Sequence, residues 1–399
     1  MIALSGNLLL FAFISYVLSS IAFVISVTGK RWSDRSPEQH KNRWGWIGFG
    51  IAVIGFLFQT GFIITRWIAG GHFPTSNMFE FMAFLAYSII LAFIIIFLVY
   101  RITVIGAFVM PVGIIMLAYA SVFPREIQPL IPALQSYWLK IHVTTAALGE
   151  GAFAVGFAAG LMYLVRTVNQ EISTRSTKWL EATLCMVLML VGFIITTMGF
   201  SASGYQATFQ TGGNGAPMSE VIYQMPAIAG PQDATLVTEG VMKPLFETPS
   251  WMQGVNAGRK LNTLLWSILT GLILYGLIRL ATRRRLGQLI HPLVRDLDPE
   301  TIDEISYRAI AIGFPIFTLG ALIFAMIWAA EAWGRFWGWD PKEVWALITW
   351  LFYSAYLHLR LSKGWQGERS AWMAVIGFIV VMITLVFVNL VIVGLHSYA

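Results

Sequence analysis

Apolar runs long enough to cross a membrane recur along nearly the whole chain, separated by polar segments. A helix of about 20 apolar residues crosses a hydrocarbon core of about 30 Å. The pattern therefore predicts an all-α fold, a polytopic transmembrane helical bundle of about ten helices that makes one integral membrane domain over residues 1–399. The predicted spans are 7–27, 46–66, 80–100, 102–120, 143–165, 181–200, 262–280, 309–330, 344–361 and 372–394.

Two of the polar segments between the runs are long. Residues 201–261 are rich in Gly, Pro and polar side chains and form a predicted large outer loop. Residues 281–308 mix both charge signs, which predicts a partly helical cytoplasmic connector. Gly156 and Gly160 stand four positions apart in the fifth span, a spacing of small residues that favours close helix packing.

Composition excludes a water-soluble domain, because 57% of the residues are hydrophobic and only 12% are charged. The first apolar run lacks a basic leader and a small-residue cleavage site, so we expect it to be a helix of the mature protein. The single cysteine, Cys185, lies inside an apolar run and is interpreted as a small buried hydrophobe.

The positive charges are distributed unequally between the two sets of loops. Eighteen of the 26 Lys and Arg residues fall in one set, which is therefore the predicted cytoplasmic set. Both termini then lie on the outer side of the membrane. Because this topology accounts for the net charge of +6, no nucleic-acid partner is expected.

The six histidines are the leading candidates for ligands, since imidazole binds haem iron and many metals. His40 and His291 fall in cytoplasmic loops among charged neighbours, where solvated side chains are expected. The topology brings His72, His142 and His396 to the outer surface. His142 opens the fifth span and His396 closes the tenth, whereas His72 is interpreted as structural or auxiliary.

His358 lies 15 residues after Glu343 in the ninth span, about 22 Å along a helix and near its cytoplasmic end. Ionisable groups at this depth are costly and usually functional. The alternatives are a core histidine with satisfied partners and an interfacial one. No second deep histidine is present, so a bis-histidine site here needs a partner chain, or the iron is ligated on one side only.

The segment WAAEAWGRFWGWDPKEVWALITW is the densest aromatic stretch of the chain. Trp333, Trp337 and Trp339 fall within seven residues of one short outer loop, with Gly334 and Gly338 between them. Tryptophan belts are common at membrane interfaces, which is one interpretation. The other is a platform of flat side chains for a large planar apolar ligand.

Asp340, Pro341 and Glu343 match the N-cap, N1 and N3 positions of the ninth span, a capping box with proline at its favoured place. Capping accounts for both acids, and it is compatible with a second role in positioning the aromatic platform. Asn77 and Glu80 match the start of the third span in the same way.

The stretch WGRFWGWDPKE resembles the tryptophan-rich signature of the WWD family of haem-handling proteins. The segments ISYRAIAIGFPIFTLG, ALITWLFYSAYLHLR, KGWQGERSAW and GLHSY are similar to those of the CcsA (ResC) proteins of System II cytochrome c biogenesis. The resemblance covers residues 300–398, with supporting matches at 71–81 and 137–153. KGWQG and GLHSY favour CcsA over CcmC and CcmF, which share the signature.

The resemblance implies an enzyme, the haem-handling subunit of a cytochrome c synthase (haem lyase) that attaches haem b to the C-x-x-C-H motif of apocytochrome c. The haem-binding residues that it implies are the iron ligands His142, His396 and His358, and Trp333, Trp337, Trp339 and Asp340 of an outer WWD loop at 331–343. Other partners that it implies are the membrane protein CcsB (ResB) and a thioredoxin-like thiol reductant.

Two alternatives to a lyase remain open at this point. A haem exporter would bind haem at the same outer loop but would not need the C-x-x-C-H substrate. A membrane b-type cytochrome would need stacked pairs of transmembrane histidines, and no predicted span carries two.

Overall fold

The computed structural model describes residues 1–28, 36–121, 123–127, 130, 132–211, 219–250, 252 and 257–388. The chain forms two compact units. The main segments of the first unit are Met1–Asn169 and Ile290–Leu385, and the second unit consists mainly of Gln170–Leu289.

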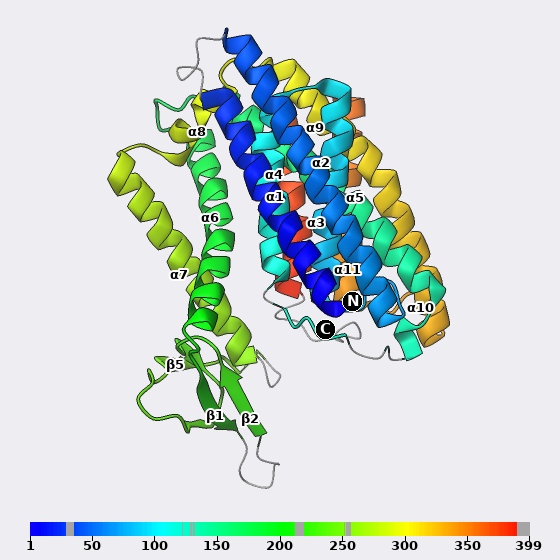
Figure 1. Cartoon of the computed structure of the whole chain (residues 1–399), viewed down its shortest axis with the longest axis vertical. Helices are drawn as coiled ribbons and strands as arrows, with labels where there is room; N and C mark the ends of the chain where they lie inside the picture. Colours follow the sequence, from blue (N-terminus) through cyan, green and yellow to red (C-terminus); the bar gives the residue numbers. More distant parts are fainter. Residues whose placement is uncertain are drawn as a thin grey trace. The chain divides into compact units, whose positions relative to one another are not determined.

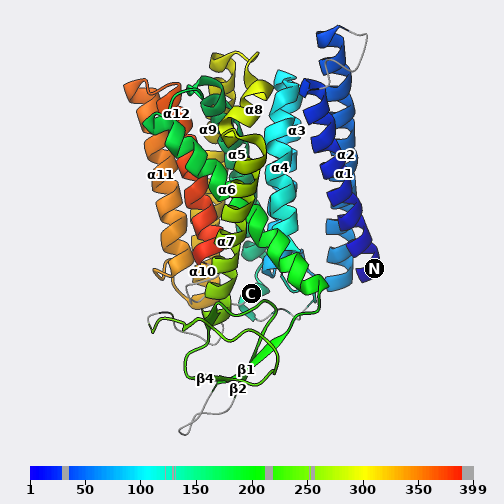
Figure 2. The same ribbon diagram turned by 90° about the vertical axis from the view of Figure 1, so that its left-hand side faces the viewer.

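The first unit is a bundle of long helices (Figure 1). Its helical elements are α1 (Ile2–Thr28), α2 (Pro37–Gly70), α3 (Met78–Tyr100), α4 (Thr103–Ala120), the 3-10 turn η2 (Pro132–Leu134), α5 (Tyr137–Thr167), α9 (Pro299–Phe317), the π-helical η3 (Thr318–Phe324), α10 (Ala325–Trp333), α11 (Pro341–Lys363), α12 (Glu368–Met382) and the π-helical η4 (Ile383–Val388). Figure 2 shows α1 beside α2 and α11 beside α12, and each of these pairs is in contact.

Helix α5 is the centre of this bundle and contacts α3, α4, α9, η3 and α12. Small residues make the close packing possible. A Cβ on Gly149 would lie 2.7 Å from the backbone of Phe317, and one on Gly151 would lie 2.6 Å from the backbone of Ser88. The prediction that Gly156 lies at a close helix contact is confirmed, because a Cβ there would lie 2.6 Å from the Ile310 side chain.

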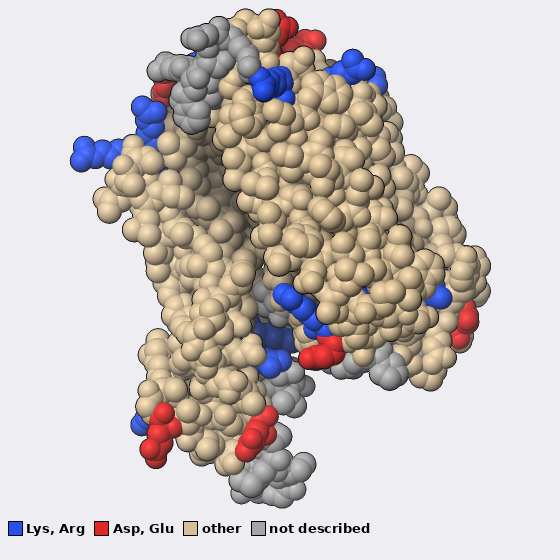
Figure 3. Space-filling model, viewed as in Figure 1, with Lys and Arg blue, Asp and Glu red and all other residues tan. Residues whose placement is uncertain are grey.

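Nine helices in the described part of the chain are long and apolar enough to cross a membrane. The polytopic all-α membrane fold is therefore confirmed. The predicted span 344–361 corresponds to α11, a helix of 23 residues that is not among the nine. Its aromatic and charged residues make it less apolar than the others. Figure 3 shows an uncharged surface over α1 and α2, with Lys, Arg, Asp and Glu at the two ends of this bundle.

The second unit combines a helical hairpin with short strands. Its elements are α6 (Arg175–Ala202), β1 (Ala207–Thr211), β2 (Ser219–Tyr223), β3 (Ala229–Gly230), β4 (Ala234–Leu236), β5 (Phe246–Glu247) and α7 (Ala257–Thr282), while α8 (Leu286–Val294) continues into the first unit in sequence. The two long helices cross tightly, since a Cβ on Gly192 would lie 2.7 Å from the backbone N of Gly271.

The strands form an antiparallel sheet of order β2-β1-β4 and a parallel pair, β3-β5. Phe209 of β1 is opposite Val221 of β2 and Leu236 of β4, and it lies in a small apolar core with Ala207. All five strands fall in the segment 201–261 that was predicted as an outer loop. The location of this segment outside the membrane, like the division into domains, stays a prediction.

Candidate functional site

His142 is oriented by a hydrogen bond to a backbone carbonyl. It lies in the second turn of α5, half-buried, with Nδ1 3.0 Å from the Gly320 carbonyl oxygen. A carbonyl only accepts, so Nδ1 carries the proton and the lone pair lies on Nε2. This tautomer suits a metal ligand, since ligating histidines usually donate their other nitrogen to a neighbouring acceptor.

The π-helical segment η3 brings the Gly320 carbonyl to that position. Gly320 packs so closely on α5 that an added Cβ would overlap the backbone N of Ala146, one turn after His142. The Ala325 N–H donates to the same Gly320 carbonyl, as the wider π-helical turn requires. The orientation of His142 therefore depends on a glycine and a local widening of the facing helix.

Trp328 and Trp333 extend the ring contacts of His142. The His142 ring stacks on Trp328 with centroids 5.6 Å apart and planes 13° apart, and Trp328 meets Trp333 edge-on at 4.7 Å. Trp328 is buried, and Trp333 ends α10. The Ser136 hydroxyl donates to the Glu331 carboxylate across 2.7 Å, which ties the start of α5 to the same helix.

After α10 the chain turns into the tryptophan-rich loop that the sequence analysis identified. Gly334 caps α10 in the left-handed conformation with φ of 68°, and α11 begins at Pro341. Trp337 meets Trp339 edge-on with centroids 6.1 Å apart. Trp339 is itself left-handed at φ of 57°, a strained conformation for a residue with a Cβ.

Glu343 stabilises this strained turn. The predicted capping box is confirmed, since the Asp340 side chain accepts from the Lys342 N–H and the Glu343 carboxylate accepts from the Asp340 N–H. Glu343 also accepts from the Gly338 N–H at 2.8 Å. Its carboxylate therefore binds the N–H groups on both sides of Trp339 and has a second role beyond capping.

The aromatic side chains of the loop differ in exposure. Trp339 is 70% exposed and Phe336 is 65% exposed, whereas Trp337 is half-buried. The indole N–H of Trp337 is buried and has no acceptor among the described residues. Phe336 was not among the predicted site residues, although its place between the tryptophans was a signal for it. Nothing in the sequence indicated the role of Gly320.

His358 has a different environment. It lies on the exposed face of α11, where its nearest hydrogen-bonding neighbour is the Ser362 hydroxyl at 3.5 Å. The opposite face of α11 is buried through Tyr353, Tyr356 and Arg360. His358 therefore points away from the bundle that carries it.

His396 lies outside the described residues, so its predicted position beside His142 stays a prediction. Among the described residues, no group of three or more His, Cys, Asp or Glu side chains is placed to hold a metal ion. The expectation that His40 is solvated is wrong. It is 3% exposed, with Nε2 3.1 Å from the Ile25 carbonyl oxygen, because it lies in the first turns of α2 and packs back on α1.

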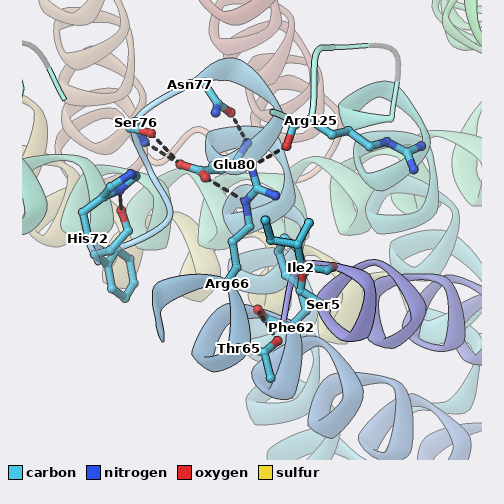
Figure 4. A network of polar contacts seen from close by, with 11 residues as sticks. Ile2, Ser5, Phe62, Thr65, Arg66, His72, Ser76, Asn77, Glu80 and Arg125 are labelled. Atoms are coloured by element: carbon cyan, nitrogen blue, oxygen red, sulfur yellow. Dashed lines mark hydrogen bonds and ion pairs between the residues drawn. The ribbon is translucent and has the colours of Figure 1, made fainter. Parts of the chain in front are cut away.

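Figure 4 shows a buried ion pair where α2 ends and α3 begins. Arg66 Nε lies 2.7 Å from Glu80, and the two side chains are 4% and 1% exposed. Asn77 caps α3 as predicted, but the Glu80 carboxylate accepts from Ser76 instead of the capping residue. Arg66 also donates to the Arg125 carbonyl, which ties in the segment before α5.

His72 lies beside this network (Figure 4). It is buried, with Nδ1 3.1 Å from the Phe73 carbonyl oxygen, and Nε2 has no partner in the part of the chain that the structure describes. The interpretation of His72 as structural or auxiliary stays a prediction.

Comparison with known proteins gives the family. A profile described as "Cytochrome C assembly protein" matches residues 75–204 and 262–396, and so omits 205–261, the segment that holds all five strands. The chain is 32% identical over 356 residues to "Cytochrome c biogenesis protein CcsA" of Gloeobacter violaceus, covering 88% of this chain and 86% of that protein.

Two further relatives with the same name agree. The protein of Nostoc punctiforme is 34% identical over 88% of this chain and 87% of its own length. That of Synechococcus sp. (strain JA-2-3B'a(2-13)) is 32% identical over 96% of this chain and 93% of its own length. The chain therefore belongs to the cytochrome c assembly protein family and is a multi-pass membrane protein of cytochrome c biogenesis, similar to CcsA.

Proposed function

We propose that this chain is the haem-handling subunit of a cytochrome c synthase, which presents haem b on its tryptophan-rich loop for attachment to apocytochrome c. The observation that carries the proposal is the orientation of His142. Its Nδ1 is hydrogen-bonded to Gly320, its ring stacks on Trp328, and the lone pair of Nε2 is the one that would ligate iron.

Three features of the loop support a haem platform. Trp339 and Phe336 are exposed, and flat apolar side chains of this kind suit a porphyrin. Glu343 holds the turn between them in a fixed conformation. In the proposal His396 supplies the second axial ligand from the end of the chain, and Asp340 orders the loop through its cap.

The chemistry proposed for the site needs no redox-active side chain of its own. Each substrate thiol adds across a haem vinyl group, so that sulfur bonds to the vinyl carbon next to the ring and the thiol proton goes to the terminal carbon. The reacting thiols belong to the C-x-x-C-H motif of apocytochrome c, kept reduced by a thioredoxin-like protein. The role of this chain is to hold and orient haem beside that motif.

The outward direction of His358 supports a role for a second membrane protein. His358 lies on the exposed face of α11, away from the residues that α11 buries in its own bundle, so a ligand from another chain could reach it. We infer that a CcsB (ResB) subunit covers this face and completes an inner haem site, from which haem moves to the periplasmic face.

The visible spectrum of the protein purified with its CcsB partner tests the outer site. We expect a bis-imidazole haem spectrum that the His142→Ala/His396→Ala variant loses. Unchanged haem content in that variant would refute the ligand assignment.

Maturation of a reporter c-type cytochrome separates the lyase from an exporter. We expect the Trp337→Ala/Trp339→Ala variant to insert normally and to fail in thioether formation. An exporter would instead bind haem at the outer loop and show no dependence on the C-x-x-C-H motif of the reporter.

A further inference from the structure

We propose that Arg335, together with the indole N–H of Trp337, forms a subsite on the loop for the carboxylates of the porphyrin propionates. The inference rests on the proposed function, since it takes haem as the ligand of this loop, and it names the part of the ligand that these two residues recognise.

Gly334 and Gly338 determine the position of the Arg335 side chain. Gly334 turns the chain after α10, and Arg335 then folds back along the loop. A Cβ on Gly338 would lie 2.8 Å from Nη2 and 2.9 Å from Nε of Arg335. The guanidinium is therefore seated directly against the backbone of Gly338, between Trp337 and Trp339 in sequence.

The charge of Arg335 is not neutralised within the described part of the chain. None of the ion pairs there involves Arg335. The three acids of the loop are bound elsewhere: Glu331 accepts from the Ser136 hydroxyl, Asp340 caps α11, and Glu343 accepts from the backbone of Gly338 and of Asp340. An exposed cation thus lies among aromatic residues with its local acids already bound.

Trp337 adds a second donor of the same kind. Its indole N–H is buried, and no described residue supplies an acceptor, which is costly unless a ligand does so. A guanidinium binds a carboxylate through two parallel N–H donors, and an indole N–H is a donor only. The Trp337 ring also meets the exposed ring of Trp339 edge-on, and two donors on this aromatic loop match a flat apolar ligand with acidic groups on one edge.

The other cations predicted on the outer side are less well placed. Arg66 is bound by Glu80, and the Arg125 guanidinium lies 5.7 Å over the ring of Phe79. Lys342 has interactions of its own. Lys140 lies two residues before His142 on α5, and it serves as the control in the test.

The test is a titration of the purified complex with ferric haem and with its dimethyl ester, followed by the Soret band. The ester keeps the ring and the iron but has no acidic groups. We expect Arg335→Ala to bind haem about tenfold more weakly than the natural protein and the ester equally well. Arg335→Lys should recover part of the loss, because it restores the charge without the fork.

Two further variants retain the positive charge of Arg335. Gly338→Ala displaces the guanidinium from its place against the Gly338 backbone, and Trp337→Phe removes the indole N–H while keeping an aromatic ring. Each should weaken haem binding by a smaller factor than Arg335→Ala. Lys140→Ala should leave it unchanged. Circular dichroism should be unaltered in all of them, since Arg335 is exposed.

The outcomes separate this inference from the proposed function. Equal haem affinity in Arg335→Ala and the natural protein, or equal weakening for haem and ester, would overturn the propionate subsite. Loss of affinity in Lys140→Ala alone would assign the subsite to that residue instead. A natural protein that binds neither haem nor ester would overturn the proposed function, and the inference with it.

Discussion

The two ends of the helical bundle in the first unit contain the same kinds of group in different arrangements. Each end has a buried arginine–carboxylate pair: Arg66–Glu80 at the predicted outer end and Arg360–Asp303 at the inner end. Each end also has a candidate haem ligand. His142 is held by a carbonyl and a stacked indole, whereas His358 lies on an exposed helix face.

The difference shows that one bundle can fix the orientation of one candidate ligand and leave that of another unfixed. A histidine fixed by its own chain has the same orientation before and after its ligand binds, which lowers the cost of binding. A histidine on an exposed face gains a fixed orientation only when something covers it. The Arg360–Asp303 pair joins α11, the helix of His358, to α9, whereas the Arg66–Glu80 pair joins α2 to α3 and is tied to the segment before α5, the helix of His142. The comparison is therefore tested first through the pairs.

The largest expected effect comes from breaking either pair. In Arg360→Ala the Asp303 carboxylate loses two contacts of 2.9 Å, and in Arg66→Ala the Glu80 carboxylate loses one of 2.7 Å. Removing one partner leaves a buried charge, which costs about 3–5 kcal/mol of unfolding free energy. Chemical unfolding of the purified protein in detergent measures it.

The exposed pair of Arg295 and Asp296 is the control, because its side chains are 64% and 57% exposed. Arg295→Ala should change the free energy of unfolding by less than about 0.5 kcal/mol. If Arg66→Ala and Arg360→Ala changed the free energy of unfolding as little as this control, the buried pairs would not stabilise the helices at either end of the bundle.

Gly320→Ala should have the next largest effect, because it disturbs the element that orients His142. The new methyl group would overlap the backbone of Ala146, and such overpacking costs about 1–3 kcal/mol. It should also weaken haem binding by moving the carbonyl away from Nδ1 of His142. Gly50→Ala is the matched control, since a Cβ there has no atom within 4 Å. Similar haem affinity in both variants would show that the Gly320 carbonyl does not orient the ligand.

A smaller effect is expected from Glu343→Ala. The N–H groups of Gly338 and Asp340 lose their acceptor, and partly exposed donors of this kind cost about 1 kcal/mol when left unbound. The strained turn at Trp339 should then relax and become accessible to protease. Glu304→Ala, which removes only an exposed pair with Arg308, should leave the cleavage rate unchanged. Equal protection of the loop in both variants would argue against the role of Glu343.

The sequence predicted the parts of this comparison that depend on composition and local pattern. The all-helical membrane fold followed from apolar runs, and the caps at Asp340 and Asn77 followed from their spacing. Close packing at Gly156 followed from small residues one turn apart.

Other features depend on contacts between distant segments, which local pattern does not encode. The Gly320 carbonyl reaches His142 because η3 is π-helical and packs closely on α5, and neither is visible in an apolar run. Arg66 and Arg360 are buried because carboxylates of other helices pair with them. The solvated interpretation of His40 is wrong because its ring lies against the Ile25 carbonyl of α1. Strands β3, β4 and β5 have only two or three residues, too few for an alternating pattern, whereas β1 (ATFQT) does alternate and was a signal that the loop prediction did not use.

The smallest expected effect on the chain alone is that of His358→Ala. Because His358 is exposed and its nearest polar neighbour is 3.5 Å away, its loss should change the free energy of unfolding by less than about 0.5 kcal/mol. If a partner subunit covers this face of α11, the same substitution should lower the haem content of the co-purified complex, although it leaves the chain's own stability intact. His142→Ala in the same complex gives the reference for loss of a ligand held by its own chain. An unchanged haem content of the His358→Ala complex would leave His142 as the one described histidine of this chain that serves haem, and the exposed face of α11 would then be a lipid-facing surface.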